Sequence, residues 1–265
     1  MNCSYNELDL CNPVEIAINR FAHHPSIALI KENVEIDDGN KFNFFDINNK
    51  EMEKEISDID INKNDIFDSI PSKILKEMSD ICTPISTNVW NIEIVKEEKF
   101  PELLKLAEVT PVYKKENKLL LKNYRAISIL SVSSKLFEKL IQNQIISYID
   151  KFLAPFLSGY RKGYSTQAAL ISLIEKWKIC LDNKGFSGAV LMDLSKAFDT
   201  RNHQLLIAKL NAYGFSKQAL SIVLCYLTNR KQRVKINNSF SSWKDLNNGV
   251  PQGSVLGPLL FNICL

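Results

Sequence analysis

The sequence predicts an α+β fold, and three observations carry this prediction. Segments with apolar residues at helical spacing are mixed with short β-rich stretches, and they do not alternate in the regular order that gives a doubly wound parallel sheet. The chain of 265 residues is long enough to bury a sizeable core in one or two domains. Its composition, with 45% hydrophobic and 24% charged residues, is close to the globular average, which argues against general disorder.

The charge of the chain is unevenly distributed. Residues 1–110 contain 11 Lys and Arg against 22 Asp and Glu, whereas residues 111–265 contain 22 against 8. Eight of the nine glycines lie at or after residue 159, so tight turns are expected mainly in the basic half. A basic half is typical of a protein with a polyanionic partner such as nucleic acid, although a solvated basic surface without a partner has the same composition.

The first part of the chain predicts a helical segment and a hairpin. Residues 1–60 are acidic and rich in Asn, and we interpret them as a connector or peripheral cover. Around residues 72–81 apolar side chains recur at helical spacing after Pro71, a residue type that favours a helix start. Residues 109–113 and 124–130 are β-rich and flank a basic turn, which indicates a hairpin.

Two amphipathic helices are predicted next. The first has one apolar face made of Leu136, Phe137, Leu140, Ile141, Ile145 and Ile149. Ser133 or Ser134 is placed to cap its start, and Pro155 follows its end. A Gly-bounded basic loop over residues 159–166 leads to the second helix, over residues 167–181. Its inward face is predicted to hold Leu170, Leu173, Ile174, Trp177 and Leu181.

A buried strand and two further helices are expected after this region. Residues 189–192 have the sequence AVLM, an apolar run that predicts a buried strand directly before Asp193. Helices are predicted around residues 206–213, closed by Gly214, and around residues 219–227, which follow Ser216.

The last part of the chain predicts a basic strand and a constrained loop. Residues 230–237 have the sequence RKQRVKIN, in which Arg233 and Lys235 share one face and the apolar residues share the other. Residues 247–258 have the sequence NNGVPQGSVLGP, and a final apolar segment follows. So many glycines and prolines specify an unusual backbone that another molecule can approach closely, which favours a functional loop over a plain turn.

Neither cysteines nor apolar runs point to an extracellular or membrane protein. The six cysteines are scattered without a C-x-x-C motif, so a disulfide framework and a zinc site are both poorly supported, and a reducing intracellular compartment is expected. No run approaches 18 uninterrupted apolar residues, and the N-terminus lacks the pattern of a signal peptide. We therefore expect no membrane partner.

Asp193 is the first candidate for chemistry. A carboxylate directly behind a buried strand is costly unless something neutralises it, and carboxylate oxygens are ligands that Mg²⁺ prefers. The alternative is an ordinary strand-terminal acid that caps the next turn. On this residue alone both interpretations stay open.

Five ordered blocks of the sequence resemble the reverse transcriptases of non-LTR retrotransposons, the jockey-like group of LINE-type elements. The two principal blocks are AVLMDLSKAFDTRNHQLLIAKL and GVPQGSVLGPLLFNI. Earlier and intervening blocks are TPVYKKENKLLLKNYRAISILSVSSKLFEKLI, GYRKGYSTQAALISLIEKW and YLTNRKQRVKINNSFSSW. The resemblance implies an RNA-directed DNA polymerase with the fingers and palm of a right-hand polymerase. Residues 61–184 would be fingers-like and residues 185–265 part of the palm, so that the reverse transcriptase region covers about residues 65–265, with residues 1–60 as an extension.

The resemblance also implies roles for residues of the two principal blocks. Asp193 would be catalytic and, with the Leu194 carbonyl, would hold metal ions. Phe198 matches the steric gate that excludes the 2′-hydroxyl of a ribonucleotide, although the residue alone favours a core aromatic. Gln252 and Gly253 match the loop that lies along the incoming nucleotide.

Cations elsewhere match phosphate-binding positions. The nucleotide triphosphate would be held by Lys114, Lys115 and Arg125, because guanidinium and ammonium groups suit phosphate oxygens. Template or primer would be held by Arg161, Lys162, Arg230, Lys231, Arg233 and Lys235, although for the basic strand a solvated face is an equal alternative. The implied substrates are an RNA template, a DNA primer and deoxynucleoside triphosphates, and the implied setting is a ribonucleoprotein of the element in the nucleus or cytoplasm.

The implied chemistry is nucleotidyl transfer with two Mg²⁺ ions, for which Mn²⁺ is a possible substitute. In the family the other carboxylates come from a paired Asp-Asp on a hairpin downstream of the PQG block, and the sequence ends at Leu265 before such a pair. We therefore expect a domain truncated before that hairpin and the thumb, and an inactive fragment. The alternative is a non-catalytic nucleic-acid-binding remnant of a mobile element.

Overall fold

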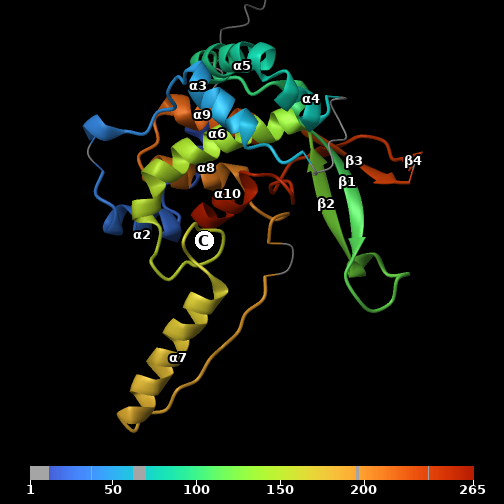
Figure 1. Cartoon of the computed structure of the whole chain (residues 1–265). Helices are drawn as coiled ribbons and strands as arrows, with labels where there is room; N and C mark the ends of the chain where they lie inside the picture. The colour runs from blue at the N-terminus through green and yellow to red at the C-terminus, as the bar shows by residue number, and fades with distance from the viewer. Residues whose placement is uncertain (1–11, 37, 62–69, 195–196, 238) are drawn as a thin grey trace, which may run out of the picture.

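The computed structural model describes residues 12–36, 38–61, 70–194, 197–237 and 239–265. A body of packed helices carries a small sheet on one side, and one long helix projects away from the body (Figure 1). The described residues thus combine helices with a sheet, in agreement with the predicted α+β class and with a polymerase fold. The division into fingers and palm stays a prediction.

The helices of the described residues are mostly short. Their bounds are α1 Pro13–Arg20, α2 Pro25–Asn33, α3 Asn49–Ser57, α4 Ser72–Glu77, α5 Ser79–Asn88, α6 Val132–Ile149, α7 Thr166–Asp182, α8 His203–Ala212, α9 Lys217–Leu227 and α10 Gly257–Cys264. A π-helical segment, Val89–Lys96, continues α5, and short 3₁₀ turns cover Asp38–Asn40, Glu102–Lys105, Leu121–Asn123 and Asp150–Phe152. The helices predicted from periodicity are present, but the segment predicted around residues 72–81 is divided at Met78 between α4 and α5.

Helix α6 crosses the middle of the helical body (Figure 1). All six apolar residues of its predicted inward face are buried, so that prediction is confirmed. The predicted cap is wrong by two or three residues: Ser131 is the N-cap, and its side chain accepts a hydrogen bond from the Ser134 N–H at 3.1 Å. Ser134 is instead inside the helix, where its hydroxyl donates to the Leu104 carbonyl.

The acidic N-terminal segment is part of the core from residue 12 onward. Helices α1 and α2 pack on α8, and α3 packs on α5 and α6. Phe42, Phe44 and Met52 are buried in the main hydrophobic cluster, and Phe42 bridges to Phe215 at the turn between α8 and α9. These side chains belong to the main hydrophobic core, so the interpretation of this segment as a connector is wrong for the described residues. The other interpretation, a cover packed on the rest of the protein, agrees with these contacts.

A five-stranded sheet stands beside the helices. Its strands are β1 Leu106–Tyr113, β2 Tyr124–Leu130, β3 Arg230–Ile236, β4 Ser239–Phe240 and β5 Lys244–Leu246. The order is β2-β1-β3-β4, with β5 also paired to β3. Strands β1 and β2 form the predicted antiparallel hairpin, with Pro111 opposite Ala126, while β1 and β3 are parallel. The hairpin extends away from the body (Figure 1).

The strand predicted over residues 189–192 is absent. This segment has no regular secondary structure, and its side chains at Val190, Leu191 and Met192 are 87%, 97% and 86% exposed. Among the residues that the structure describes, no strand pairs with it. An apolar run forms a buried strand only when a neighbouring strand satisfies its backbone groups, so the prediction fails for want of a partner.

Helix α7 forms as predicted, but its packing is different. Ser165 caps it by accepting a hydrogen bond from the Ala168 N–H at 3.1 Å. The helix points away from the body (Figure 1), and Leu170, Ile174 and Leu181 are exposed rather than inward. Its apolar face has the right spacing, yet no other described element covers it.

In the part of the chain that the structure describes, no helix has the length and apolar character needed to cross a membrane.

Candidate functional site

The loop over residues 249–256, here called the 249–256 loop, is built on two glycines with left-handed backbone. Gly249 has φ +76° and Gly253 has φ +126°, conformations that other residues rarely adopt. A Cβ atom on Gly249 would lie 2.5 Å from the Phe198 carbonyl oxygen, and one on Gly253 would lie 2.4 Å from the Ser128 carbonyl oxygen. Both glycines therefore allow the loop to lie directly against other segments of backbone.

The first of these segments contains Phe198. The Val250 N–H donates to the Phe198 carbonyl at 3.0 Å, and the Gly249 N–H donates to the Arg201 carbonyl at 2.8 Å. Nε2 of the buried His203 lies 2.6 Å from the Gly249 carbonyl oxygen, so this nitrogen donates. Burial lowers the pKa of His203, and the nearby Arg230 lowers it further, against the opposing effect of the hydrogen bond to Gly249. The two principal sequence blocks are thus joined by three hydrogen bonds.

The second segment is strand β2. The Ser128 N–H donates to the Gln252 carbonyl at 2.7 Å, so the 249–256 loop adds to the edge of the hairpin. Arg125 lies three residues earlier on the same strand and is exposed. Lys114 and Lys115 are also exposed and begin the turn between β1 and β2. The structure therefore places Gln252 and Gly253 beside the strand that carries Arg125.

Phe198 is half-buried between aromatic neighbours. Its ring stacks on Phe261 of α10, with centroids 5.1 Å apart, and meets Tyr160 edge-on at 6.0 Å. Tyr160 comes from the basic loop over residues 159–166, which is tied to α10 because Asn262 Nδ2 donates to the Gly159 carbonyl at 2.8 Å. Phe198 is therefore a core contact with an accessible part, and its role as a steric gate stays a prediction.

Helix α6 holds the far end of the 249–256 loop. The carboxylate of Glu138, which is fully buried, accepts hydrogen bonds from the Val255 N–H at 2.6 Å and the Leu256 N–H at 3.4 Å. Its other oxygen accepts from the Tyr226 hydroxyl at 2.9 Å. Burial raises the pKa of Glu138, while Arg230, the Tyr226 hydroxyl and the two N–H groups oppose the shift. One turn along α6, Gln142 Nε2 donates to the Val255 carbonyl at 2.9 Å.

Asp193 and Leu194 lie in the exposed segment that follows α7. Both are exposed, and the residues that come next, 195 and 196, are outside the described part of the chain. Within the described residues, no group of three or more His, Cys, Asp or Glu side chains is arranged to hold a metal ion. Mg²⁺ in proteins is usually held by one or two carboxylates together with water and substrate phosphates, so Asp193 and the Leu194 carbonyl could supply part of the ligands for two such ions.

The basic loop uses one of its two cations internally. The guanidinium of Arg161 donates from Nε and Nη2 to Asp150 Oδ1 at 3.2 and 3.0 Å, and from Nη1 to the Ala154 carbonyl at 3.0 Å. Its side chain is only 7% exposed and stacks on Tyr164. These donors therefore fix the loop itself, and the role of Arg161 in holding template stays a prediction. Lys162 is exposed.

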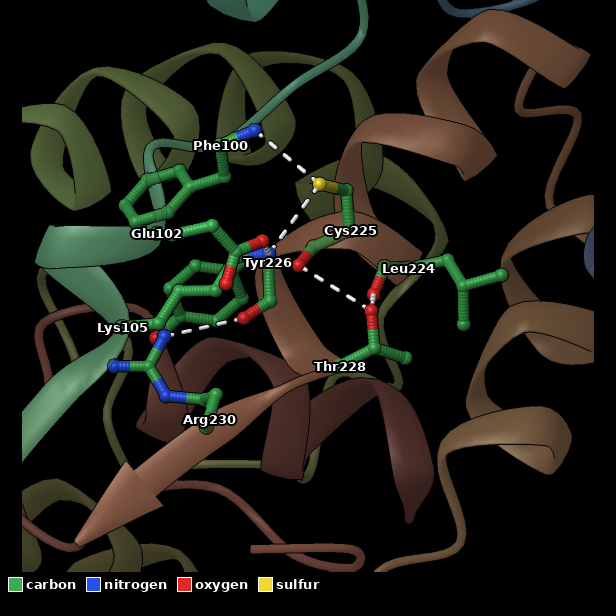
Figure 2. A network of polar contacts seen from close by, with 8 residues as sticks. All are labelled: Phe100, Glu102, Lys105, Leu224, Cys225, Tyr226, Thr228 and Arg230. Atoms are coloured by element: carbon green, nitrogen blue, oxygen red, sulfur yellow. Dashed lines mark hydrogen bonds and ion pairs between the residues drawn. The ribbon is translucent and has the colours of Figure 1, made fainter. Parts of the chain in front are cut away.

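The cations of the predicted phosphate track on β3 contact other groups of the protein. Arg230 is 1% exposed and lies inside the molecule, where Nη1 donates to the Tyr226 carbonyl at 3.1 Å and the guanidinium stacks on the Tyr226 ring (Figure 2). Arg233 pairs with the buried Glu108 and lies against Phe240 and Trp243. Lys235 pairs with the same carboxylate at 3.4 Å. The charged face of this strand thus neutralises Glu108, and Lys231 forms a long ion pair with Asp245 at 3.9 Å.

Sequence reasoning missed Glu138 and His203, which hold the two ends of the 249–256 loop. A signal for Glu138 was available, because it lies three residues before Ile141 and seven before Ile145, on the apolar face of α6. A charged residue at such a position needs partners in the folded protein. His203 has a weaker signal, since only its position at the start of α8 places it near buried residues.

Comparisons with known proteins show which family the chain belongs to. Residues 112–265 match the family model described as reverse transcriptase (RNA-dependent DNA polymerase). The chain is 30% identical over 220 residues to the Drosophila melanogaster protein named "Probable RNA-directed DNA polymerase from transposon BS". The matched region covers 81% of this chain and 24% of that protein. Identity is 31% over 208 residues to the corresponding X-element protein, covering 76% of this chain and 22% of the relative.

A third relative is the "RNA-directed DNA polymerase from mobile element jockey" of the same species, at 26% identity over 217 residues, covering 81% of this chain and 24% of the relative. The chain therefore spans about a quarter of the length of the curated relatives that it matches. The family match covers more than half of the chain and includes β2, Phe198 and the 249–256 loop. The chain belongs to the reverse transcriptase (RNA-dependent DNA polymerase) family, as a domain of the kind found in non-LTR retrotransposons.

Proposed function

We propose that β2, residues 197–203 and the 249–256 loop together bind the incoming deoxynucleoside triphosphate of an RNA-directed DNA polymerase. The observation that carries this proposal is the pair of backbone hydrogen bonds that join Val250 to Phe198 and Ser128 to Gln252. They bring together three segments that are distant in the sequence, each with a residue implied in nucleotide binding. A template RNA and a DNA primer are the other substrates, in a ribonucleoprotein inside the cell.

Each segment has a separate task in this proposal. Arg125, Lys114 and Lys115 bind the triphosphate, because their exposed cationic groups sit on the hairpin beside the loop and suit phosphate oxygens. Gln252 and Gly253 lie along the sugar and base, where a residue without a side chain permits close approach.

Phe198 selects the sugar. The part of its ring left accessible between Tyr160 and Phe261 occupies the space of a ribose 2′-hydroxyl. Lys162 is the exposed cation of the basic loop and contacts template phosphate.

The reverse transcriptase family uses divalent metal ions. We propose Asp193, with the Leu194 carbonyl, as the part of the metal site that this chain supplies, for two Mg²⁺ ions or for Mn²⁺ in their place. When bound, such ions activate the primer 3′-hydroxyl and stabilise the leaving pyrophosphate. Because the described residues hold an incomplete ligand set, the role that we derive for them is to bind and orient the nucleotide.

Sugar selection tests this function. Equilibrium binding of a deoxynucleoside triphosphate and of the matching ribonucleoside triphosphate, both with Mg²⁺, is compared for the wild type and Phe198→Ala. We expect the wild type to prefer the deoxynucleotide by about tenfold, and the variant to lose most of that preference because the 2′-hydroxyl no longer meets the ring.

A matched control is Phe186→Ala, which removes a phenylalanine that is fully exposed in the structure. This variant is expected to keep the wild-type ratio. Equal affinity of the wild type for the two sugars would contradict the proposal, and so would a preference that Phe198→Ala leaves unchanged while circular dichroism shows an intact fold.

A further inference from the structure

Glu138 is a buried carboxylate at a position of α6 where packing of the core would be satisfied by an apolar side chain. A fully buried carboxylate loses its hydration, and an apolar side chain at this position of α6 would fill the core without that cost. The carboxylate instead accepts three hydrogen bonds, two of them from successive N–H groups of the 249–256 loop. The loop ends there at the start of α10, where a negative charge is favourable.

The peptide groups of Val255 are held from both sides by α6. Glu138 accepts from the Val255 N–H, and Gln142, one turn further along the helix, donates to the Val255 carbonyl. Between this point and Gln252 the loop is stiff, because the Ser254 hydroxyl donates to the Pro251 carbonyl at 2.9 Å and accepts from the Gly257 N–H at 3.0 Å. We therefore expect a displacement at Val255 to move Gln252 as well.

The same stretch of chain also sets the other side of the loop. Ser128 of β2 donates to the Gln252 carbonyl. Only the cap residue Ser131 lies between the end of β2 and the start of α6. Glu138 and Ser128 thus act from one continuous β2–α6 unit, which also carries Arg125. The arrangement fixes Gln252 relative to Arg125.

Glu138 is itself held by Tyr226, which packs against Arg230. Its Oε1 accepts from Tyr226 of α9, whose ring stacks with the buried guanidinium of Arg230. Figure 2 shows Tyr226 and Arg230 packed together at the end of α9. Burial raises the pKa of Glu138, and the nearby positive charge of Arg230 opposes that shift.

We infer that Glu138 is a positioning residue, which holds the 249–256 loop against β2 at the distance from Arg125 that an incoming deoxynucleotide needs. This inference rests on the proposed nucleotide site and adds to it a side chain that does not touch the nucleotide. Loss of Glu138 leaves the N–H groups of Val255 and Leu256 without this acceptor, and the loop moves to satisfy them.

The experiment combines hydrogen exchange with two binding measurements on the full chain. Glu138→Leu is expected to raise the exchange rate of the loop amides at residues 255 and 256 by about tenfold or more, and to weaken binding of a deoxynucleoside triphosphate with Mg²⁺ by about tenfold. Binding of a short single-stranded RNA is expected to stay at its wild-type strength. Glu138→Gln restores an acceptor for the Val255 N–H. Its loop exchange rate and its deoxynucleotide affinity are therefore both expected to remain within about threefold of the wild-type values.

Two further variants make the result decisive. Gln144→Leu removes another buried polar side chain of α6, which accepts from the Phe45 N–H far from the loop, and it is expected to leave loop exchange and nucleotide affinity unchanged. Gln142→Leu releases the Val255 carbonyl without touching the buried carboxylate. Gln142→Leu is expected to raise the loop exchange rate and to weaken deoxynucleotide binding, each by about threefold. This variant provides a test if Glu138→Leu does not fold.

The outcomes separate this inference from the proposed function. If the wild type binds no deoxynucleotide, the proposed function fails, and the exchange rates still decide whether Glu138 holds the loop. If Glu138→Leu or Gln142→Leu leaves loop exchange at its wild-type rate, the inference is wrong. It is also wrong if the loop exchanges faster while the deoxynucleotide affinity is unchanged, or if the RNA affinity falls by the same factor.

Discussion

His203 connects the two principal sequence blocks through a single buried nitrogen. Its Nε2 donates to the Gly249 carbonyl at 2.6 Å, and burial lowers its pKa below the usual 6.5. In the unfolded chain the imidazole takes up a proton near pH 6.5, whereas in the folded chain it does so at a lower pH. Between these two values the unfolded state binds more protons, so the free energy of unfolding falls as the pH falls.

We therefore predict that acid weakens the wild type more than His203→Gln. Glutamine places an amide N–H near the position of Nε2 and does not titrate, so it keeps the hydrogen bond to Gly249. Below pH 6.5 the free energy of unfolding of the wild type is expected to fall relative to that of His203→Gln, by at most about 1.4 kcal/mol per pH unit. Urea unfolding followed by tryptophan fluorescence at pH 7.5 and 5.5 measures it.

The difference between the two proteins removes titrations that they share. Glu138 is the important one, because its raised pKa makes the folded state gain stability as the pH falls from the folded value toward 4.5, opposite to His203. A difference that stays constant between the two pH values, with both proteins folded, would mean that the imidazole is not protected from protonation by its burial against Gly249.

At the scale of elements, helices α6 and α7 have similar apolar patterns and opposite environments. Both have an N-cap serine and isoleucines at helical spacing. Ile141 of α6 has no exposed surface, whereas Ile174 of α7 is 56% exposed. Periodicity identifies which residues share a face, but it contains no information on whether another element covers that face. The difference between the two helices is therefore a property of tertiary structure.

We predict that equal truncations on these helices have unequal effects. Ile141→Ala is expected to lower the free energy of unfolding by about 2–5 kcal/mol, because it leaves a cavity in the core. Ile174→Ala is expected to change it by about 0.5 kcal/mol or less, since the side chain is mostly in solvent. Urea unfolding of the two variants and the wild type gives both numbers. A loss of about 2 kcal/mol or more for Ile174→Ala would show that α7 packs on the body in solution.

The same reasoning explains which parts of the fold and site could be predicted. The β1–β2 hairpin, the buried face of α6 and the glycine-dependent loop follow from local patterns and are present in the structure. The strand at residues 189–192 needed a partner strand that no local pattern specifies. Sequence alone also could not show that Glu108 would be neutralised by Arg233, because the two residues are 125 positions apart.

At the scale of the whole molecule, the basic half is less available to nucleic acid than its composition indicates. Arg161, Arg230 and Arg233 are engaged in internal contacts, so counting charges overstates the cationic surface. The exposed cations that remain near the proposed site include Lys114 and Lys115 on the hairpin. Helix α2, in the acidic half, lies on the opposite side of the helical body from that hairpin (Figure 1).

This arrangement predicts which charges determine the salt dependence of RNA binding. The affinity for a short single-stranded RNA is expected to fall linearly with salt on a logarithmic plot, with a slope of about −0.7 for each phosphate contacted. When no nucleotide is bound, the lysines that we assign to the triphosphate are open to RNA phosphates, so reversing Lys114 and Lys115 together to Glu should reduce the steepness by about 1.4 if each lysine then contacts one phosphate. The matched control reverses Lys31 and Lys50, two exposed lysines of α2 and α3, and is expected to keep the wild-type slope. Fluorescence anisotropy at several salt concentrations distinguishes the two pairs, and equal slopes for both double variants would mean that the hairpin is not part of the nucleic-acid surface.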